Sequence, residues 1–124
     1  MRGKKYLSVA AVVLLLIALA GCATGGYYYE GTSEVNRTYD KAKNLYEQKQ
    51  YEEAKTHFQQ IITNHPKSPL VEVAMYYLAS CHKEKKEYQK AISAYQELIN
   101  KYDYGFWVDS AKKEIERIKS AQKK

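Results

Sequence analysis

An internal repeat of 37 residues constrains the fold of this chain more than any other feature. A shift of 37 positions superimposes like residues: Ala42 on Ala79, Tyr51 on Tyr88, Ala54 on Ala91, Phe58 on Tyr95, Ile61 on Leu98 and Ile62 on Ile99. In each unit an aromatic residue is followed by an alanine three positions later and by a second aromatic four positions after that. These spacings place all three side chains on one face of a helix. The alanine lets two helices approach closely, so the repeat predicts stacked helical hairpins.

The spacing of apolar residues predicts five helices. No proline or glycine occurs between Val35 and Pro66 or between Leu70 and Gly105, and strand-like alternation of apolar and polar residues is absent from the sequence. Ser33 is a suitable N-cap for the first helix. The predicted helices cover residues 35–49, 51–64, 69–86, 88–102 and 107–121.

The last predicted helix repeats the beginning of a unit that is not completed. The same shift places Ala74 on Ala111 and Leu78 on Ile115, whereas Glu116 stands where the earlier units have alanine. One apolar stripe runs along this helix, formed by Val108, Ala111, Ile115 and Ile118. Charged residues cover the rest of its surface, as is typical of a helix that caps a repeat array.

The first 21 residues differ in composition from the rest of the chain. A basic segment with Arg2, Lys4 and Lys5 precedes an uncharged run from Tyr6 to Ala20, which is the order found in secretion signals. A helix over that run would span about 22 Å, less than the roughly 30 Å of a bilayer's hydrocarbon core. The segment is therefore expected to be a signal peptide and not a permanent membrane span.

The residues that follow the apolar run predict a lipid attachment site. Leu19-Ala20-Gly21-Cys22 resembles the lipobox of bacterial lipoproteins, in which small residues precede a cysteine that receives the lipid. The resemblance implies cleavage after residue 21 and lipidation of Cys22. An uncleaved anchor with an incidental cysteine is the alternative. Ala23 after the cysteine implies, in a host with two membranes, the outer membrane facing the periplasm.

The remaining sequence is divided into a tether and a domain. Residues 22–34 contain three glycines and no apolar periodicity, which is typical of a flexible tether, and residues 35–124 form the predicted domain. Removal of the signal lowers the formal net charge from +6 to about +3, because three of the 20 Lys and Arg residues leave with it. The basic excess lies in the last segment without interleaved aromatics, so nucleic acid is not an expected partner. With Cys22 lipidated, Cys81 has no partner for a disulfide within the chain.

The repeated residues resemble the tetratricopeptide repeat over about residues 36–120. The unit is three residues longer than the usual 34. The resemblance implies an all-α, TPR-like α-solenoid of about five helices, with two repeats and a capping helix after the cleaved lipoprotein signal. Residues 64–69 (Asn-His-Pro-Lys-Ser-Pro), followed by residues 74–79 (Ala-Met-Tyr-Tyr-Leu-Ala), are also similar to BamD-like outer-membrane assembly lipoproteins and to the Tol-Pal-associated periplasmic coordinator.

The sequence favours a binding protein over an enzyme. Phosphate-binding glycine loops, nucleophile elbows and HExxH pairs do not occur in it, and no cofactor or metal is expected. By resemblance, the first helix of each unit contributes to a concave face that binds partner proteins. That face includes Asn36, Tyr39, Lys43, Tyr46, Val73, Tyr76, Ser80 and Lys83. Alternatively, the tyrosines of this face do not bind a partner and only pack between helices.

The leading functional hypothesis is a lipid-anchored, non-enzymatic adaptor that binds an envelope protein in an assembly or maintenance complex. Membrane attachment would come from the lipid on Cys22. One alternative is a structural lipoprotein that self-associates through its open repeat ends without a distinct client. Another is a subunit of an enzyme whose chemistry resides in its partner.

Overall fold

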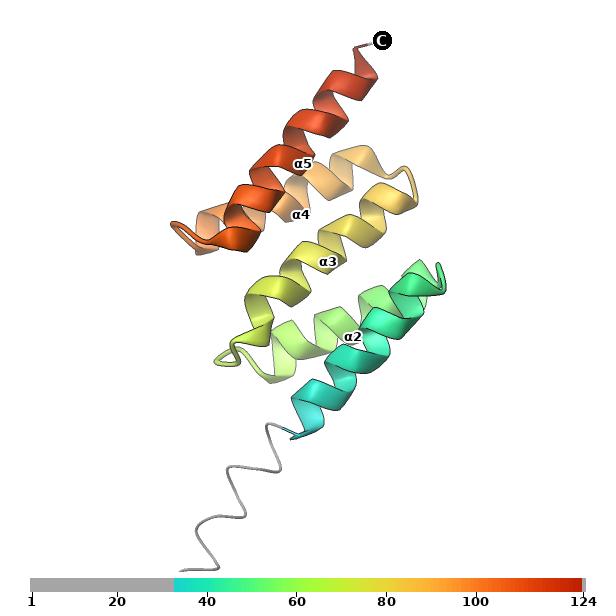
Figure 1. Cartoon of the computed structure of the whole chain (residues 1–124), viewed down its shortest axis with the longest axis vertical. Helices are drawn as coiled ribbons and strands as arrows, with labels where there is room; N and C mark the ends of the chain where they lie inside the picture. Colours follow the sequence, from blue (N-terminus) through green and yellow to red (C-terminus); the bar gives the residue numbers. More distant parts are fainter. Residues whose placement is uncertain (1–32, 124) are drawn as a thin grey trace, which may run out of the picture. The chain divides into compact units, whose positions relative to one another are not determined.

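The computed structural model describes residues 33–123, and this part of the chain is built from five helices without strands (Figure 1). The predicted signal peptide, Cys22 and most of the predicted tether lie outside the described residues. The helices cover residues 33–47, α2 (Tyr51–Asn64), α3 (Leu70–Glu84), α4 (Tyr88–Lys101) and α5 (Phe106–Gln122). Each begins and ends within two residues of its predicted position. The first helix already includes Ser33, so the prediction that Ser33 precedes it as the N-cap is wrong.

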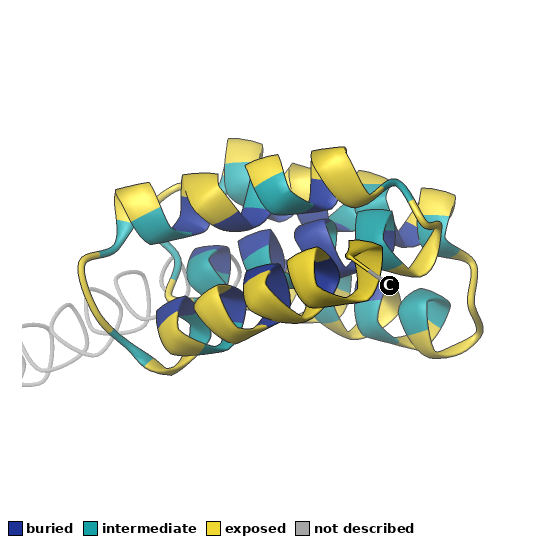
Figure 2. Ribbon diagram, turned by 90° about the horizontal axis from the view of Figure 1, so that it is seen from above, coloured by how far each residue is buried: buried dark blue, intermediate teal, exposed yellow. Residues whose placement is uncertain are grey.

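Successive helices are antiparallel and form an α-solenoid, as the repeat predicts. Next to the turn between the first helix and α2, the ring centroids of Tyr46 and Tyr51 lie 5.5 Å apart. Further from that turn, the same two helices are in contact through Tyr39 and Phe58, whose ring centroids lie 6.2 Å apart. The same alternation of direction continues through α3, α4 and α5 (Figure 1). The first helix, α3 and α5 form one layer, and α2 and α4 form the other (Figures 1 and 2).

The two turns that end the first helix and α3 have the same geometry. Lys49 and Lys86, which are 37 residues apart, are the non-glycine residues with positive φ among those described, at 63° and 62°. The amide of Gln50 donates to the carbonyl of Leu45 at 2.8 Å, and 37 positions later Glu87 donates to His82 at 2.9 Å. A residue in the left-handed conformation, followed by an amide that donates to the carbonyl five residues earlier, gives the last carbonyls of a helix hydrogen-bond partners. The repeat is therefore a repeat of backbone conformation as well as of apolar residues.

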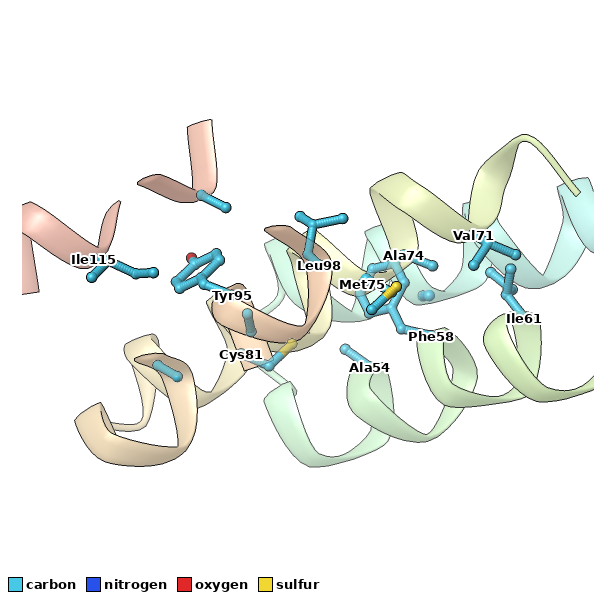
Figure 3. Packing of buried hydrophobic residues seen from close by; sticks show 14 of the residues in the cluster. Ala54, Phe58, Ile61, Val71, Ala74, Met75, Cys81, Tyr95, Leu98 and Ile115 are labelled. Carbon is cyan, nitrogen blue, oxygen red and sulfur yellow. The ribbon is translucent and has the colours of Figure 1, made fainter. Parts of the chain in front are cut away.

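The core is one cluster with residues from all five helices. The repeated alanines Ala42, Ala54, Ala79 and Ala91 are fully buried, which confirms that helices cross closely at these positions. Phe58 and its counterpart Tyr95 are also fully buried, and Figure 3 shows both within the cluster.

The change from phenylalanine to tyrosine in the second unit adds a buried hydroxyl. The hydroxyl of Tyr95 lies 2.8 Å from that of Ser80, whose own hydroxyl also donates to the carbonyl of Tyr76 at 3.0 Å. A buried polar group without a partner would lower the stability of the fold. A serine is therefore needed at position 80 as the hydrogen-bond partner of the Tyr95 hydroxyl.

The capping role of α5 is confirmed by its burial pattern. Val108, Ala111, Ile115 and Ile118 are buried against the preceding hairpin, while Glu116 is exposed. Glu114 is the exception, because it is a charged residue that is only 7 % exposed. Its partners belong to the surface described next.

Candidate binding surface

A continuous set of aromatic side chains crosses the layer formed by the first helix, α3 and α5. Its members, which we call the aromatic face, are Tyr39 and Tyr46 from the first helix, Tyr76 and Tyr77 from α3, and Trp107 from α5; all five are partly exposed. Tyr46 contacts Tyr77 at 5.3 Å between ring centroids, Tyr77 contacts Trp107 at 5.9 Å, and Tyr76 contacts Trp107 at 5.0 Å. Tyr39 joins the set through the buried Phe58, whose ring contacts both Tyr39 and Tyr77. Tilted and edge-on ring contacts of this kind are favourable, so the face is held in one arrangement.

Tyr77 is the centre of this surface, and the sequence did not identify it. Its ring stacks on the buried Phe58 at 5.5 Å with an interplanar angle of 13°. Its hydroxyl accepts a hydrogen bond from Lys43 Nζ at 3.0 Å, and that ammonium also lies 4.2 Å from the ring centroid. Tyr77 therefore connects the surface to the core and fixes the nearest positive charge.

Charged residues occupy one end of the aromatic face, between α3 and α5. Lys83 Nζ donates to Glu114 at 3.1 Å, and Arg117 donates to the other oxygen of the same carboxylate. Burial lowers the pKa of Lys83, but the hydrogen bond and the charge of Glu114 outweigh it and raise the pKa above its ordinary value. Lys83 is therefore held as a cation in a position that a partner could reach.

The eight residues predicted for the concave face have different environments. Asn36 is exposed; Tyr39, Lys43, Tyr46, Tyr76 and Lys83 are partly exposed. Val73 and Ser80 are buried at 6 % and 2 % exposure, so placing them on the binding surface was wrong. Val73 is covered by its neighbours, and Ser80 is occupied by the hydroxyl of Tyr95. Trp107, which is partly exposed, belongs to the surface in their place.

One hollow among the described residues lies away from the aromatic face. It has a volume of about 530 Å³ and is lined mainly by exposed polar residues of α2, with Leu78 and His82 of α3 beneath them. Another of about 430 Å³ includes Lys83 and Glu114 and lies between the end of α3 and α5. Among the described residues no cluster of His, Cys, Asp and Glu could hold a metal ion.

The cysteine predicted to be a small core residue is buried. Cys81 is fully buried, and this burial raises the pKa of its thiol to about 12. A thiol in this state is a poor nucleophile.

In the described part of the chain, no helix combines the length and the apolar character needed to cross a bilayer.

A His82–Glu87 hydrogen bond fixes the turn between α3 and α4. His82 Nδ1 donates to the Glu87 carboxylate at 2.6 Å, and this bond, with Lys85 and Lys90 nearby, lowers the pKa of Glu87 to about 2. A carboxylate whose pKa is lowered by folding stabilises the fold above its unfolded pKa of 4.5, and this contribution is lost as the pH falls toward 2.

Replacing Glu87 by glutamine should therefore flatten the acid side of the stability profile. The melting temperature of Glu87→Gln should lie a few degrees below that of the unmodified protein at neutral pH, and the gap should close as the pH approaches 2. Thermal unfolding followed by circular dichroism across this range measures the gap. Glu97→Gln, an exposed position on α4, is the control. A gap that stays constant with pH would contradict the assignment.

The tetratricopeptide repeat family matches residues 34–103, which is more than half of the 124-residue chain. Comparisons with curated proteins and with solved structures found no match. The matched range contains both complete units, and α5 continues the same geometry beyond it. Repeats of this family generally mediate protein–protein interaction and are typically not catalytic. The arrangement of helices, the repeated turns and the family match together establish that the chain belongs to the tetratricopeptide repeat family.

Proposed function

We propose that this protein is a lipid-anchored, non-enzymatic adaptor whose aromatic face binds a segment of an envelope protein. The observation that carries the proposal is the continuous aromatic face, which spans three helices and stays partly exposed. Side chains without a binding role can be covered by the fold, whereas here five aromatic rings reach the surface of one layer. Tyrosine and tryptophan provide large contact areas at low entropic cost and keep a polar group for hydrogen bonds.

The charges beside the aromatic face favour a partner segment with acidic or polar groups. Lys43 and Lys83 each remain partly exposed although each already has an internal partner. Hydrogen bonding to Tyr77 and the charges around Lys43 outweigh the effect of burial and raise the pKa of its ammonium. Two fixed cations at the margins of an apolar strip would set the direction in which an extended or helical segment binds.

The sequence supports the membrane part of the proposal. Leu19-Ala20-Gly21-Cys22 follows a basic and then an apolar segment, and residues 22–34 could span about 40 Å when extended. The lipid would hold the adaptor at a bacterial membrane, and we place it at the outer membrane, facing the periplasm, in a host with two membranes. The likeness of residues 64–79 to outer-membrane assembly lipoproteins favours an assembly or maintenance complex.

Co-purification tests the adaptor role. Tagged full-length protein from detergent-solubilised host membranes should retain one distinct envelope protein, identified by mass spectrometry. Retention should fall at least tenfold when Tyr46 and Tyr76 are both changed to serine. Gln96→Ser is the control, because Gln96 is exposed on α4 in the other layer.

Circular dichroism of each variant at the assay temperature ensures that only folded proteins are compared. Equal retention by the double variant and by Gln96→Ser would contradict binding through the aromatic face. If the protein recovers only its own copies, with a mass that rises with concentration, it is a self-associating structural lipoprotein.

A further inference from the structure

Two large aromatic side chains lie outside the core beside the aromatic face. Tyr104 is 87 % exposed and Phe106 is 73 % exposed, and they stand on either side of Gly105, where the α4–α5 turn ends and α5 begins. The ring of Phe106 contacts that of Trp107, at 5.0 Å between centroids. Tyr88, at 36 %, is the next most exposed large apolar residue among those described. Exposed apolar side chains that gather at one place can mark an interaction site.

The backbone of this turn depends on a glycine between the two aromatic residues. Gly105 has φ at 141°, which other residues rarely adopt, and a Cβ atom there would lie 3.1 Å from Glu72 Oε1. Trp107, one residue later, turns inward and packs on Tyr76. The equivalent turn of the first unit has Lys67 and Pro69 at the positions of Tyr104 and Phe106 and is exposed as well.

The exposed turn lies at the same edge of the domain as the start of the first helix. Because successive helices are antiparallel, Val35, the α2–α3 turn (residues 65–69) and the α4–α5 turn (residues 102–105) lie at one edge, which we call the N-terminal edge (Figure 1). The other edge carries the turns that begin after residues 47 and 84. The chain that leads from Cys22 enters the domain at the N-terminal edge.

We propose that the N-terminal edge contacts the headgroup region of the bilayer, with Tyr104 and Phe106 as the side chains that insert. This inference rests on the lipid anchor proposed above and adds a second membrane contact to it. Aromatic residues are favoured at the level of the headgroups, where an apolar ring and a polar group are both accommodated. A weak contact is sufficient, because the lipid keeps the edge at a high effective concentration near the membrane.

The charges at this edge indicate that the contact is apolar and not electrostatic. Lys67 and Lys101 are exposed there, and the carboxylates of Asp103 and Glu72 at the same edge offset their charge. We therefore expect the contact to change little between low and high salt, unlike the binding of a polybasic segment. With the N-terminal edge on the membrane, the aromatic face stays open at the side of the domain, where a partner can reach it.

Spin-label accessibility tests the proposal on the full-length, lipidated protein in phosphatidylethanolamine–phosphatidylglycerol vesicles. A nitroxide attached to Asp103→Cys reports on the N-terminal edge without removing either aromatic ring. A nitroxide at Gln48→Cys, exposed in the first turn at the other edge, is the matched control. Cys81 does not interfere, because it is fully buried.

The expected result is a severalfold higher ratio of oxygen to nickel-complex accessibility at residue 103 than at residue 48, at low and at high salt. The double change Tyr104→Ser and Phe106→Ser should lower the ratio at residue 103 to the value at residue 48. Equal ratios in the unmodified background would overturn the proposal. An accessibility ratio at residue 103 that grows with the protein-to-lipid ratio would also overturn the proposal, because it would show contact between copies of the protein.

Failure of the anchor is recognised separately. The mass of the purified protein reports whether Cys22 carries lipid, and flotation reports whether the protein stays with the vesicles. Unmodified protein that does not float would overturn both the anchor and the edge contact. Lipidated protein that floats, with equal accessibility at residues 103 and 48, would overturn the edge contact alone.

Discussion

Replacing Phe58 by alanine should lower the stability of the domain by about 3 to 5 kcal/mol, which corresponds to a fall in melting temperature of roughly 15 to 30 °C. Phe58 is fully buried, stacks on Tyr77 and contacts the edge of Tyr39. Its loss leaves a cavity at the point where α2 meets the aromatic face. A domain of this size is typically stable by about 5 to 15 kcal/mol, so much of the protein could be unfolded at physiological temperature.

Thermal and urea unfolding of the two proteins measure this effect. Gln59→Ala is the matched control, because the neighbouring residue on the same helix is exposed and its replacement should change the melting temperature by no more than a few degrees. A loss of stability in Phe58→Ala as small as that of the control would mean that the stacked pair of Phe58 and Tyr77 does not hold the core together.

Changing Cys22 to serine should move the protein completely from the membrane fraction to the soluble fraction. In the proposed lipidation the thiol of Cys22 would be the nucleophile that accepts the lipid, and a serine hydroxyl would not replace it. Fractionation of host cells, followed by immunoblotting and by the mass of the purified N-terminal peptide, measures the outcome.

The other cysteine provides the control for the anchor. Cys81→Ala removes a buried side chain from α3 and should leave the membrane fraction unchanged as long as the domain folds. If Cys22→Ser stayed in the membrane fraction in a form that alkaline carbonate does not extract, the uncleaved apolar segment would be the anchor, and the lipoprotein prediction would be wrong.

The fold was predictable because the apolar spacing and the repeated alanines both agree with it. Ala42, Ala54, Ala79 and Ala91 recur at the positions where helices cross, and their complete burial confirms it. Helix boundaries were also close, since polar breaks separate the apolar stretches. The positive φ of Lys49 and Lys86 was not predictable, because lysine carries no signal for a left-handed conformation.

The binding surface was predictable only in part, because it depends on contacts between distant helices. Tyr39, Tyr46 and Tyr76 were identified from the repeat positions. Tyr77 was missed, because the repeat places it on Asp40, which is not aromatic. Trp107 was missed because it joins the face only through the packing of α5 on α3. Whether Cys22 carries a lipid stays a prediction from the sequence.

A photo-crosslinking amino acid at Tyr76 tests the central claim, that the aromatic face holds an envelope protein, most directly. It is introduced into the full-length protein in its host, and adducts are identified in the membrane fraction by mass spectrometry. The same amino acid at Gln96, exposed on α4 in the other layer, is the control. The account predicts one heterologous envelope protein crosslinked from residue 76 and not from residue 96. Adducts with other copies of this chain only, or the same adducts from both positions, would contradict it.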